Sequence, residues 1–339
     1  MSDPHVEVLG AGVAGLCCAQ AFVARGCRVT LRAASDGADA ECCSWWAGGM
    51  LAPRCERESA APLIETLGLE SMAHWREHAP HVDRLGTLVL VGPRDRPDLE
   101  QFAARTTGHV RLDTTGIDAL EPALESRFGS GLHFDGEAHL DPRRTLDALQ
   151  RWLHAQPGVH VVHERLDARR LGTVPDDVDW RIDCRGLAAR DVLRDLRGVR
   201  GEMCLLHLPE LRLNRPIRLL HPRHPIYIVP RADGVYMVGA TMIESDERGP
   251  VTARSLMELL NSAHALHPAF GEARLLESGA DARPAFADNL PRLRRRGRTL
   301  YVNGLFRHGF LCAPAMARRA VERALDARID HEVTDEDHD

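Results

Sequence analysis

The chain has 339 residues, a net charge of −6 and 44% hydrophobic residues, a composition typical of a globular protein of about two domains. All 43 basic residues are arginine, so a phosphate-loop lysine, a Schiff-base lysine and a lysine general base are excluded. The charge is spread without a long basic run. We therefore expect a small-molecule substrate, and neither nucleic acid nor a membrane as partner.

The nine cysteines include two adjacent pairs, Cys17-Cys18 and Cys42-Cys43, but no C-x-x-C and no metal-ligand spacing. This set predicts reduced thiols and no metal site. The apolar run at residues 9–22 could pass for a signal peptide, but Asp3 and Glu7 give its start the wrong charge for export. No apolar stretch is long enough to span a bilayer, and we expect a cytoplasmic protein.

The first part of the chain predicts a strand at residues 6–9, a helix at 16–25 and a second strand at 28–31. Between the first strand and the helix lies Gly10-Ala11-Gly12-Val13-Ala14-Gly15, a G-x-G-x-x-G turn. Its glycines permit a tight turn, a close approach of backbone to a pyrophosphate, and packing of the helix on the strand. The unit predicts a Rossmann-type dinucleotide site with phosphates at the helix N-terminus.

One position departs from that pattern. The acidic residue expected at the end of the second strand, where it would bind ribose hydroxyls, falls on Ala33. Arg32 could accommodate a 2′-phosphate, which would favour NADP. Alternatively, Asp36 or Ser35 could take over the ribose contact, or the adenosine could be bound more weakly. The sequence leaves these alternatives open.

Later elements suggest how the chain is divided. We expect strands at residues 86–92, 131–134, 226–229 and 234–241, and helices at 62–78, 97–106, 142–155, 252–267 and 313–328. These elements predict an α/β fold, in which a Rossmann-type domain carries an inserted antiparallel-sheet substrate domain. The expected limits are 1–80, 140–204 and 278–330 for the nucleotide-binding domain, 81–139 and 205–277 for the substrate domain, and 331–339 for a frayed acidic tail.

A string of small residues flanked by aromatics follows the nucleotide unit: Cys43-Ser44-Trp45-Trp46-Ala47-Gly48-Gly49-Met50-Leu51-Ala52-Pro53. Small residues let backbone lie flat against a large planar ligand, with N–H groups within reach of its heteroatoms. A glycine-rich loop without a ligand would explain the same residues. The sequence does not say which way Trp45 and Trp46 point.

With two later blocks, this string resembles the D-amino-acid-oxidase superfamily, and most closely the glycine oxidases of thiamin thiazole biosynthesis. The resemblance runs over nearly the whole chain. It is strong at the glycine turn, at residues 44–50, from Tyr227-Ile228-Val229-Pro230 through Val238-Gly239-Ala240-Thr241-Met242, and from Ala282-Arg283-Pro284 through Asn303-Gly304-Leu305-Phe306-Arg307-His308-Gly309-Phe310-Leu311. It implies a D-amino-acid-oxidase-like fold and a flavoprotein oxidoreductase with FAD as cofactor.

The resemblance also implies four catalytic residues. Arg283 would pair with the substrate carboxylate through its planar fork, and Tyr227 would donate a hydrogen bond to the same group. Met242 would line the pocket near the reacting carbon, and Arg307 would assist at the flavin or touch the substrate. The alternatives are a surface ion pair for Arg283 and core packing for Met242.

The implied cofactor site uses backbone more than side chains. The segment 304–311, with a helix behind it, would stabilise negative charge on the reduced flavin. Family members often carry Asn where this chain has His308. Because the cofactor accepts the electrons, the reaction needs no general base, and we expect a structural or cofactor-contacting His308. Residues 182–186 resemble the strand and glycine that close over FAD, although a plain strand-to-turn connection explains them nearly as well. The residues implied to bind FAD are Gly10, Gly12, Val13, Ala14, Gly15, Ser44, Ala47, Gly48, Gly49, Met50, Gly186, Gly304, Leu305, Phe306, Arg307, His308, Gly309, Phe310 and Leu311.

The implied activity is oxidative deamination of glycine, a small N-substituted glycine or a small D-amino acid to the imine. The imine would give glyoxylate or a 2-oxo acid, dioxygen would become hydrogen peroxide, and the reaction would serve thiamin thiazole synthesis. The alternatives are an oxidase or dehydrogenase of larger D-amino acids with a non-oxygen acceptor, and a non-catalytic flavin-binding module suggested by Ala33. A nicotinamide-dependent dehydrogenase would explain the glycine turn alone. The sequence leaves open whether the chain forms a homo-oligomer.

Overall fold

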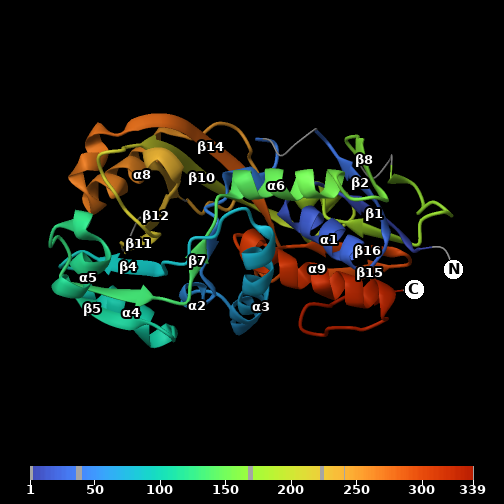
Figure 1. Ribbon diagram of the computed structural model, residues 1–339, viewed down its shortest axis with the longest axis horizontal. Coiled ribbons are helices and arrows are strands. Elements are labelled where there is room, and N and C mark those ends of the chain that lie inside the picture. Colours follow the sequence, from blue (N-terminus) through green and yellow to red (C-terminus); the bar gives the residue numbers. More distant parts are fainter. Residues whose placement is uncertain (1–2, 36–39, 167–170, 222–224, 240, 339) are drawn as a thin grey trace.

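Two large β-sheets lie toward opposite ends of the long axis of the molecule (Figure 1). The structure is a computed structural model that describes residues 3–35, 40–166, 171–221, 225–239 and 241–338. Both termini lie at the end that holds the first sheet.

The first sheet has seven strands in the order β17-β15-β16-β9-β1-β2-β8, all paired in parallel except β15 with β16. Both strands predicted at the start of the chain are confirmed. β1 lies between β2 and β9, so its carboxyl end delivers the glycine turn to the middle of the sheet. The strands are β1 (His5–Leu9), β2 (Arg28–Ala33), β8 (Val159–His163), β9 (Trp180–Asp183), β15 (Arg292–Arg296), β16 (Thr299–Asn303) and β17 (Asp337–His338).

We call each large sheet together with the helices that pack on it a lobe. The helices of the first lobe build the largest hydrophobic core. They are α1 (Val13–Ala24), α3 (Pro62–His78), α6 (Pro142–His154) and α9 (Gly309–Leu325), and a short helix α2 (Pro53–Glu56) precedes α3. Helix α1 packs against α9 and α6. Its residues Leu16 and Phe22 are fully buried.

Helix α9 begins earlier than the predicted residue 313. Proline favours the first turn of a helix, but Pro314 lies inside α9. Proline has no N–H to bond the carbonyl one turn back, which belongs to Phe310. The indole Nε1 of the fully buried Trp75 donates to that carbonyl oxygen at 2.6 Å, so the carbonyl is satisfied and the helix continues.

The second sheet has eight strands in the order β14-β10-β13-β12-β11-β4-β6-β5. We expected an antiparallel sheet, and all pairs are antiparallel except β4 with β11. Helices α4 (Arg96–Arg105), α5 (Thr114–Leu120) and α8 (Ala253–Leu266) belong to this lobe. A small third sheet pairs β3 (Met50–Leu51) with β7 (Ala138–His139). The eight strands are β4 (Thr87–Val91), β5 (Val110–Asp113), β6 (Ser130–Phe134), β10 (Arg197–His207), β11 (Ile217–Leu220), β12 (Ile226–Pro230), β13 (Val235–Gly239) and β14 (Arg274–Ala285).

The two longest strands, β10 and β14, were not predicted. Each carries glycines and buried charged residues, which break the apolar alternation by which strands are recognised. Both strands cross an expected domain limit, at 204/205 and at 277/278. The domain limits themselves stay a prediction.

The prediction of a frayed acidic tail was wrong. Strand β17 pairs with β15, and Val333 is fully buried. Asp335 lies 2.7 Å from Nε of Arg294, and Asp337 lies 2.8 Å from Nη2 of Arg323. The tail is ordered because β15 and α9 present arginines to its carboxylates.

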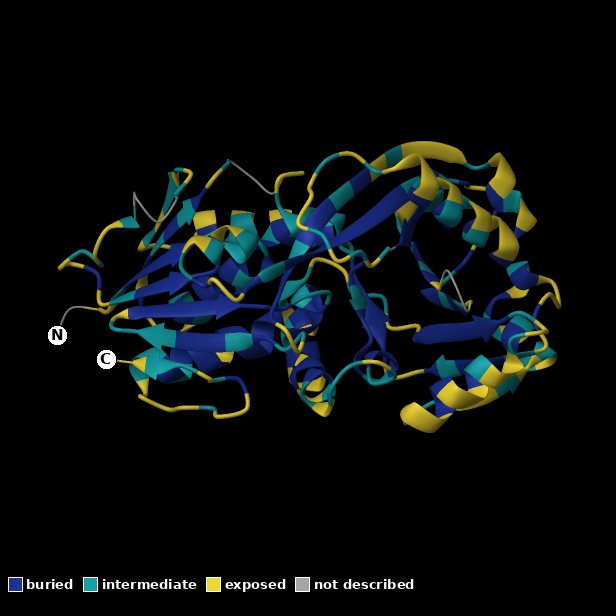
Figure 2. Cartoon of the chain, turned by 180° about the vertical axis from the view of Figure 1, so that it is seen from behind, coloured by how far each residue is buried: buried dark blue, intermediate teal, exposed yellow. Residues whose placement is uncertain are grey.

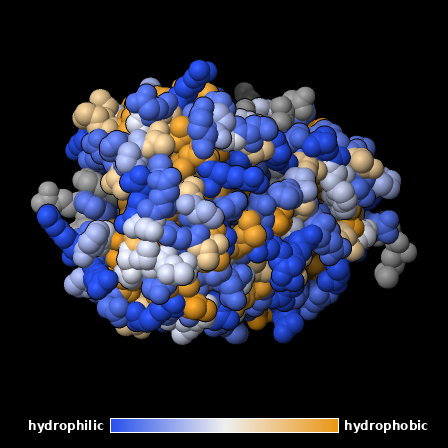
Figure 3. All heavy atoms as spheres, turned by 60° about the vertical axis from the view of Figure 1, so that its left-hand side comes forward, coloured by the Kyte–Doolittle hydropathy of each residue, from blue (hydrophilic) through white to orange (hydrophobic). Residues whose placement is uncertain are grey.

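The two lobes differ in how far their elements are exposed at the surface. Most of the first sheet is buried, whereas α4 and α8 each expose one side (Figure 2). On the face drawn in Figure 3, hydrophobic residues form small separate groups among hydrophilic ones. None of the described helices is long and apolar enough to cross a membrane.

Candidate active site

A cavity of about 660 Å³ is lined by residues of both lobes and brings most of the predicted site together. Seven of the predicted residues lie outside its lining: Gly10, Gly12, Ala14, Gly15, Gly186, Gly304 and Leu305. Those that line it are Arg283, Tyr227, Met242, Arg307, Val13, Ser44, Ala47, Gly48, Gly49, Met50, Phe306, His308, Gly309, Phe310 and Leu311.

The glycine turn is closely packed at one end of the cavity. A Cβ atom at Gly15 would lie 1.8 Å from the carbonyl oxygen of Gly10, so the third glycine is required for helix α1 to pack on β1. No side chain caps α1 at Gly12, and its first turn holds no acidic residue. The N–H of Val13 donates to Oγ of Ser44 at 3.1 Å, which joins the small-residue loop to this helix N-terminus. The positive end of α1 is therefore suited to a phosphate.

Arg32 is not available for a 2′-phosphate in this structure. Its guanidinium lies 2.6 Å from Oε1 of Glu7 and 3.1 Å from Oε2 of Glu164. This geometry disfavours the NADP alternative. Ala33 ends β2, and Asp36, the suggested replacement for the missing acid, lies outside the described residues.

Gly186 follows β9 with a φ of +57°. Its carbonyl accepts a hydrogen bond from Nδ2 of Asn303 at 2.9 Å, so this turn is tied to the end of β16. The preceding Cys184 packs on the glycine turn, since a Cβ atom at Gly10 would lie 2.7 Å from its carbonyl oxygen.

Arg283 on β14 and Tyr227 on β12 form one side of the cavity, which we call the floor. Nη1 of Arg283 donates to the carbonyl of Thr241 at 3.3 Å, and no carboxylate among the described residues forms an ion pair with this guanidinium. The surface ion pair considered for Arg283 is thus not found. Burial lowers the pKa of Arg283 and raises the pKa of Tyr227.

Glu56 was missed by the sequence analysis, and with Arg218, Arg307 and His308 it forms the wall of the cavity. Its carboxylate lies 2.7 Å from Nη2 of Arg307, 2.9 Å from Nε2 of His308 and 3.1 Å from Nη1 of Arg218. Burial alone would raise the pKa of Glu56. The charges of Arg307 and Arg218 and the bond to His308 outweigh burial and hold that pKa well below its usual range.

His308 is also the N-cap residue of α9, and no side chain caps this helix. Burial lowers the pKa of His308, although the carboxylate of Glu56 opposes that shift. Because Gly309, Phe310 and Leu311 line the cavity, the positive end of a second helix meets it.

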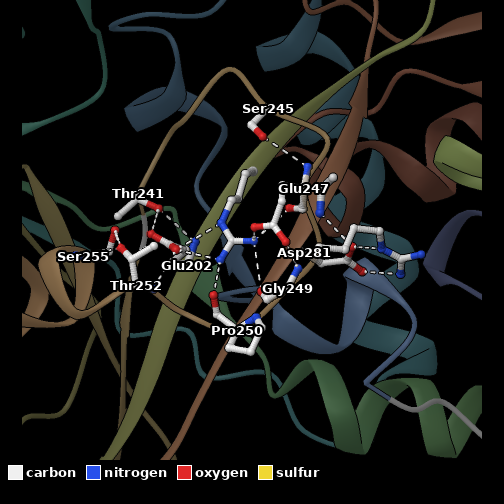
Figure 4. Close-up of polar contacts among 12 residues, drawn as sticks. Glu202, Thr241, Ser245, Glu247, Gly249, Pro250, Thr252, Ser255 and Asp281 are labelled. Atoms are coloured by element: carbon white, nitrogen blue, oxygen red, sulfur yellow. Dashed lines mark hydrogen bonds and ion pairs between the residues drawn. The ribbon is translucent and has the colours of Figure 1, made fainter.

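Met242 lies at the mouth of the cavity and is 62% exposed, so core packing does not describe it. It belongs to the segment after β13. In Figure 4, Glu247, Gly249 and Pro250 of this segment lie near Glu202 of β10, and Arg200 donates hydrogen bonds to all four. The Arg200 guanidinium donates to Glu202 at 2.8 Å and to the carbonyls of Gly249 and Pro250 at 3.0 and 2.6 Å. Arg200, which a buried ion pair with Glu202 holds in place, therefore binds this segment at Gly249 and Pro250, and its backbone pairs with Ile243, the residue after Met242.

The two tryptophans line different cavities. Trp46 lines the large one and lies over Gly279, where a Cβ atom would be 2.0 Å from its ring. Trp45 lines a separate cavity of about 230 Å³, and the guanidinium of Arg143 stacks 4.2 Å from the centre of its ring. Trp46 is thus the one that can limit the size of a ligand in the large cavity.

One cavity thus connects two helix N-termini that have no acidic residue in their first turn, a loop of small residues and a cationic floor. This arrangement fits a dinucleotide with a large planar ring, and it defines the class of α/β dinucleotide-binding enzymes. Among the described residues there is no group of His, Cys, Asp and Glu that could hold a metal ion.

The chain belongs to the D-amino-acid-oxidase family of FAD-dependent oxidoreductases. The family model, described as FAD dependent oxidoreductase, matches residues 5–323. The resemblance inferred from the motifs is confirmed, as are the fold class and FAD as cofactor.

Sequence and structural similarity to individual proteins supports this family membership. A protein of Rhizobium etli, provisionally assigned as the thiamine biosynthesis oxidoreductase ThiO, is 54% identical over 324 residues, covering 95% of this chain and 96% of its own length. Glycine oxidase of Pseudomonas aeruginosa is 25% identical over 93% of each chain. The crystal structure of glycine oxidase from Geobacillus kaustophilus superposes with a TM-score of 0.80 at 22% identity, covering 96% of this chain and 95% of that one.

Proposed function

We propose that this enzyme oxidises glycine or a small N-substituted glycine such as sarcosine. The observation that carries the proposal is the Arg283 guanidinium, which lies beside Tyr227 in the cavity without a carboxylate partner among the described residues. A partly buried cation of this kind is suited to one carboxylate of a small ligand. The names of the relatives, a ThiO protein and glycine oxidases, support the same substrate class.

The proposed overall reaction converts glycine, dioxygen and water into glyoxylate, ammonia and hydrogen peroxide. Bound FAD would supply the two-electron acceptor for the amine. A role in thiamin thiazole synthesis, in which the imine is used before it hydrolyses, follows from the relatives' names. A cytoplasmic location and dioxygen as acceptor stay predictions, and the oligomeric state stays open.

The chain's own residues would bind and orient both molecules. Arg283 would hold the substrate carboxylate through two parallel N–H donors, and Tyr227 would donate its hydroxyl proton to the same carboxylate. Because burial raises the pKa of Tyr227, this phenol stays protonated and remains a donor at neutral pH. Met242 would cover the mouth of the pocket near the reacting carbon.

The cofactor would be held mainly by backbone. The N-terminus of α1 at residues 10–15 would bind the pyrophosphate, and the loop 44–50 would lie along the planar ring. The N-terminus of α9 at residues 309–311 would stabilise negative charge on the reduced ring. Since Glu56 already binds Arg307, we assign Arg307 and His308 to the support of this site rather than to the carboxylate.

Product analysis tests the proposal. The FAD-loaded protein would be supplied in air with glycine, sarcosine or D-alanine, and oxygen uptake, glyoxylate, ammonia and peroxide would be measured. We expect one peroxide and one glyoxylate for each glycine consumed. Turnover only of larger D-amino acids, or only with a quinone, would instead support the alternative function, an oxidase or dehydrogenase of larger D-amino acids with a non-oxygen acceptor. Retention of FAD without turnover of any amine would support a non-catalytic module.

A further inference from the structure

Glycines lie beneath the functional side chains of the floor. One cross-strand row consists of Gly279 on β14, Met203 on β10, Gly239 on β13 and Tyr227 on β12. Residues paired across strands share one face of a sheet, so these four face the same way. The ring of Tyr227 rests on this row, because a Cβ atom at Gly239 would lie 3.0 Å from its Cε2.

The next row on the same face pairs Gly201 of β10 with Asp281 of β14, two residues before Arg283. A Cβ atom at Gly201 would lie 1.9 Å from Nη2 and 2.2 Å from Cζ of Arg283. Contacts between non-bonded atoms are not that short. The Arg283 guanidinium therefore fills the space that any side chain at residue 201 would need.

The backbone at Gly201 does not itself require glycine. Gly201 does not have a positive φ angle, whereas Gly49 and Gly304 have φ angles of +73° and +74°. The three atoms nearest to a Cβ at residue 201 all belong to the Arg283 guanidinium. Alanine could adopt this backbone, and the nearest group that excludes it is the guanidinium of Arg283.

We propose that Gly201 is a positioning residue for the substrate carboxylate. Having no side chain, it lets the Arg283 guanidinium lie flat against β10, and this sets the depth at which the carboxylate is bound. The inference rests on the proposed function, because it takes Arg283 as the carboxylate anchor. Tyr227 is positioned in the same way, with a Cβ at Gly48 only 2.8 Å from its Cε2, so both donors of the floor rest on glycine.

The test is the Gly201→Ala variant of the FAD-loaded protein. The KM for glycine is measured together with the Kd for glycolate, which has the carboxylate without the amine and is followed by the change in flavin absorption. We expect both constants to rise together by about tenfold or more, a factor that corresponds to displacement of one charged anchor. The matched control is Gly131→Ala on β6 of the same sheet, where a Cβ would lie 2.8 Å from Cδ2 of Leu90 and 2.9 Å from the carbonyl oxygen of Val89, none of which lines the cavity. We expect it to leave both constants unchanged.

A double variant shows whether Gly201 acts through Arg283. In the Arg283→Ala background, Gly201→Ala should not weaken glycolate binding further, since residues that act as a unit are not additive. Arg283→Ala should also raise the melting temperature more in the Gly201→Ala background than in the wild type, because the alanine at residue 201 then occupies the space of the guanidinium. This comparison decides the question even if Gly201→Ala alone folds poorly.

Two results would overturn the inference. One is a folded Gly201→Ala protein with unchanged glycolate Kd, and the other is an Arg283→Ala change that raises the melting temperature no more in Gly201→Ala than in the wild type. A wild-type protein that neither binds glycolate nor oxidises glycine would instead overturn the proposed function. The melting comparison would still report separately on the steric contact between residues 201 and 283.

Discussion

The floor and the wall of the cavity treat their arginines in opposite ways. On the wall, Arg307 and Arg218 share the carboxylate of Glu56. On the floor, Arg283 donates to a backbone carbonyl and has no ion pair among the described residues. Positive charge alone therefore does not mark an anion-binding site. On the wall both arginines already share a carboxylate, whereas the floor offers a guanidinium to which the carboxylate of a ligand can bind.

We expect the largest loss of stability for a substitution that breaks the ion pairs of the wall. Replacing Glu56 with Ala leaves the partly buried side chains of Arg218 and Arg307, which are 15% and 26% exposed, without their shared carboxylate. The loss should approach the value of about 3–5 kcal/mol that is typical for removal of one partner of a buried pair. Unfolding by urea should show this loss. Glu58→Ala is the control, because its pair with the half-exposed Arg105 should contribute less than about 1 kcal/mol. A loss no larger than that of the control would show that the wall is not held by its charges.

On the floor, the corresponding change should weaken binding rather than stability. Arg283→Ala should raise the KM for glycine by roughly 100-fold, about 2.7 kcal/mol, through loss of a charge-assisted anchor. The melting temperature should stay the same or rise, because a partly buried charge without a partner is removed. Steady-state kinetics and thermal unfolding of the same preparation check both parts. An unchanged KM would mean that the carboxylate binds elsewhere.

A third prediction concerns pH and the carboxyl group of Glu137 behind the wall. Burial raises the pKa of Glu137 to about 7, although its Oε1 accepts the N–H of Cys55 at 2.7 Å. A folded pKa above the unfolded one means that the group's contribution is present at low pH and is lost as pH rises through about 7. The free energy of unfolding should therefore fall by roughly 1–3 kcal/mol more between pH 5 and pH 8 in the wild type than in Glu137→Gln. Equal pH dependence in the two proteins would contradict the buried neutral carboxyl.

The smallest effect is expected for the second donor of the floor. Tyr227→Phe keeps the ring on its glycine row and removes one hydrogen bond, which is worth about 1 kcal/mol. The KM for glycine should rise about fivefold, and the melting temperature should not change. Steady-state kinetics across a range of glycine concentrations measures this. A loss as large as that for Arg283→Ala would give the hydroxyl a further role.

Local chemistry explains what the sequence could predict. The glycine turn follows a strand directly and opens a helix, so its function is encoded within a few residues. Arg283 and Tyr227 were found only because longer blocks carried a family resemblance. Glu56 has no local signal, since its partner Arg218 is 162 residues away and any of 43 arginines could have filled that place. The ordered tail was missed for the same reason, because its partners lie on β15 and α9.

The most direct test of the proposed glycine oxidation is the visible absorption spectrum of the FAD-loaded protein before and after anaerobic addition of glycine. We expect glycine to bleach the flavin absorption of the wild type, and we expect Arg283→Ala to need a glycine concentration roughly 100-fold higher for the same bleaching. A wild-type flavin spectrum that glycine leaves unchanged would contradict the proposed function.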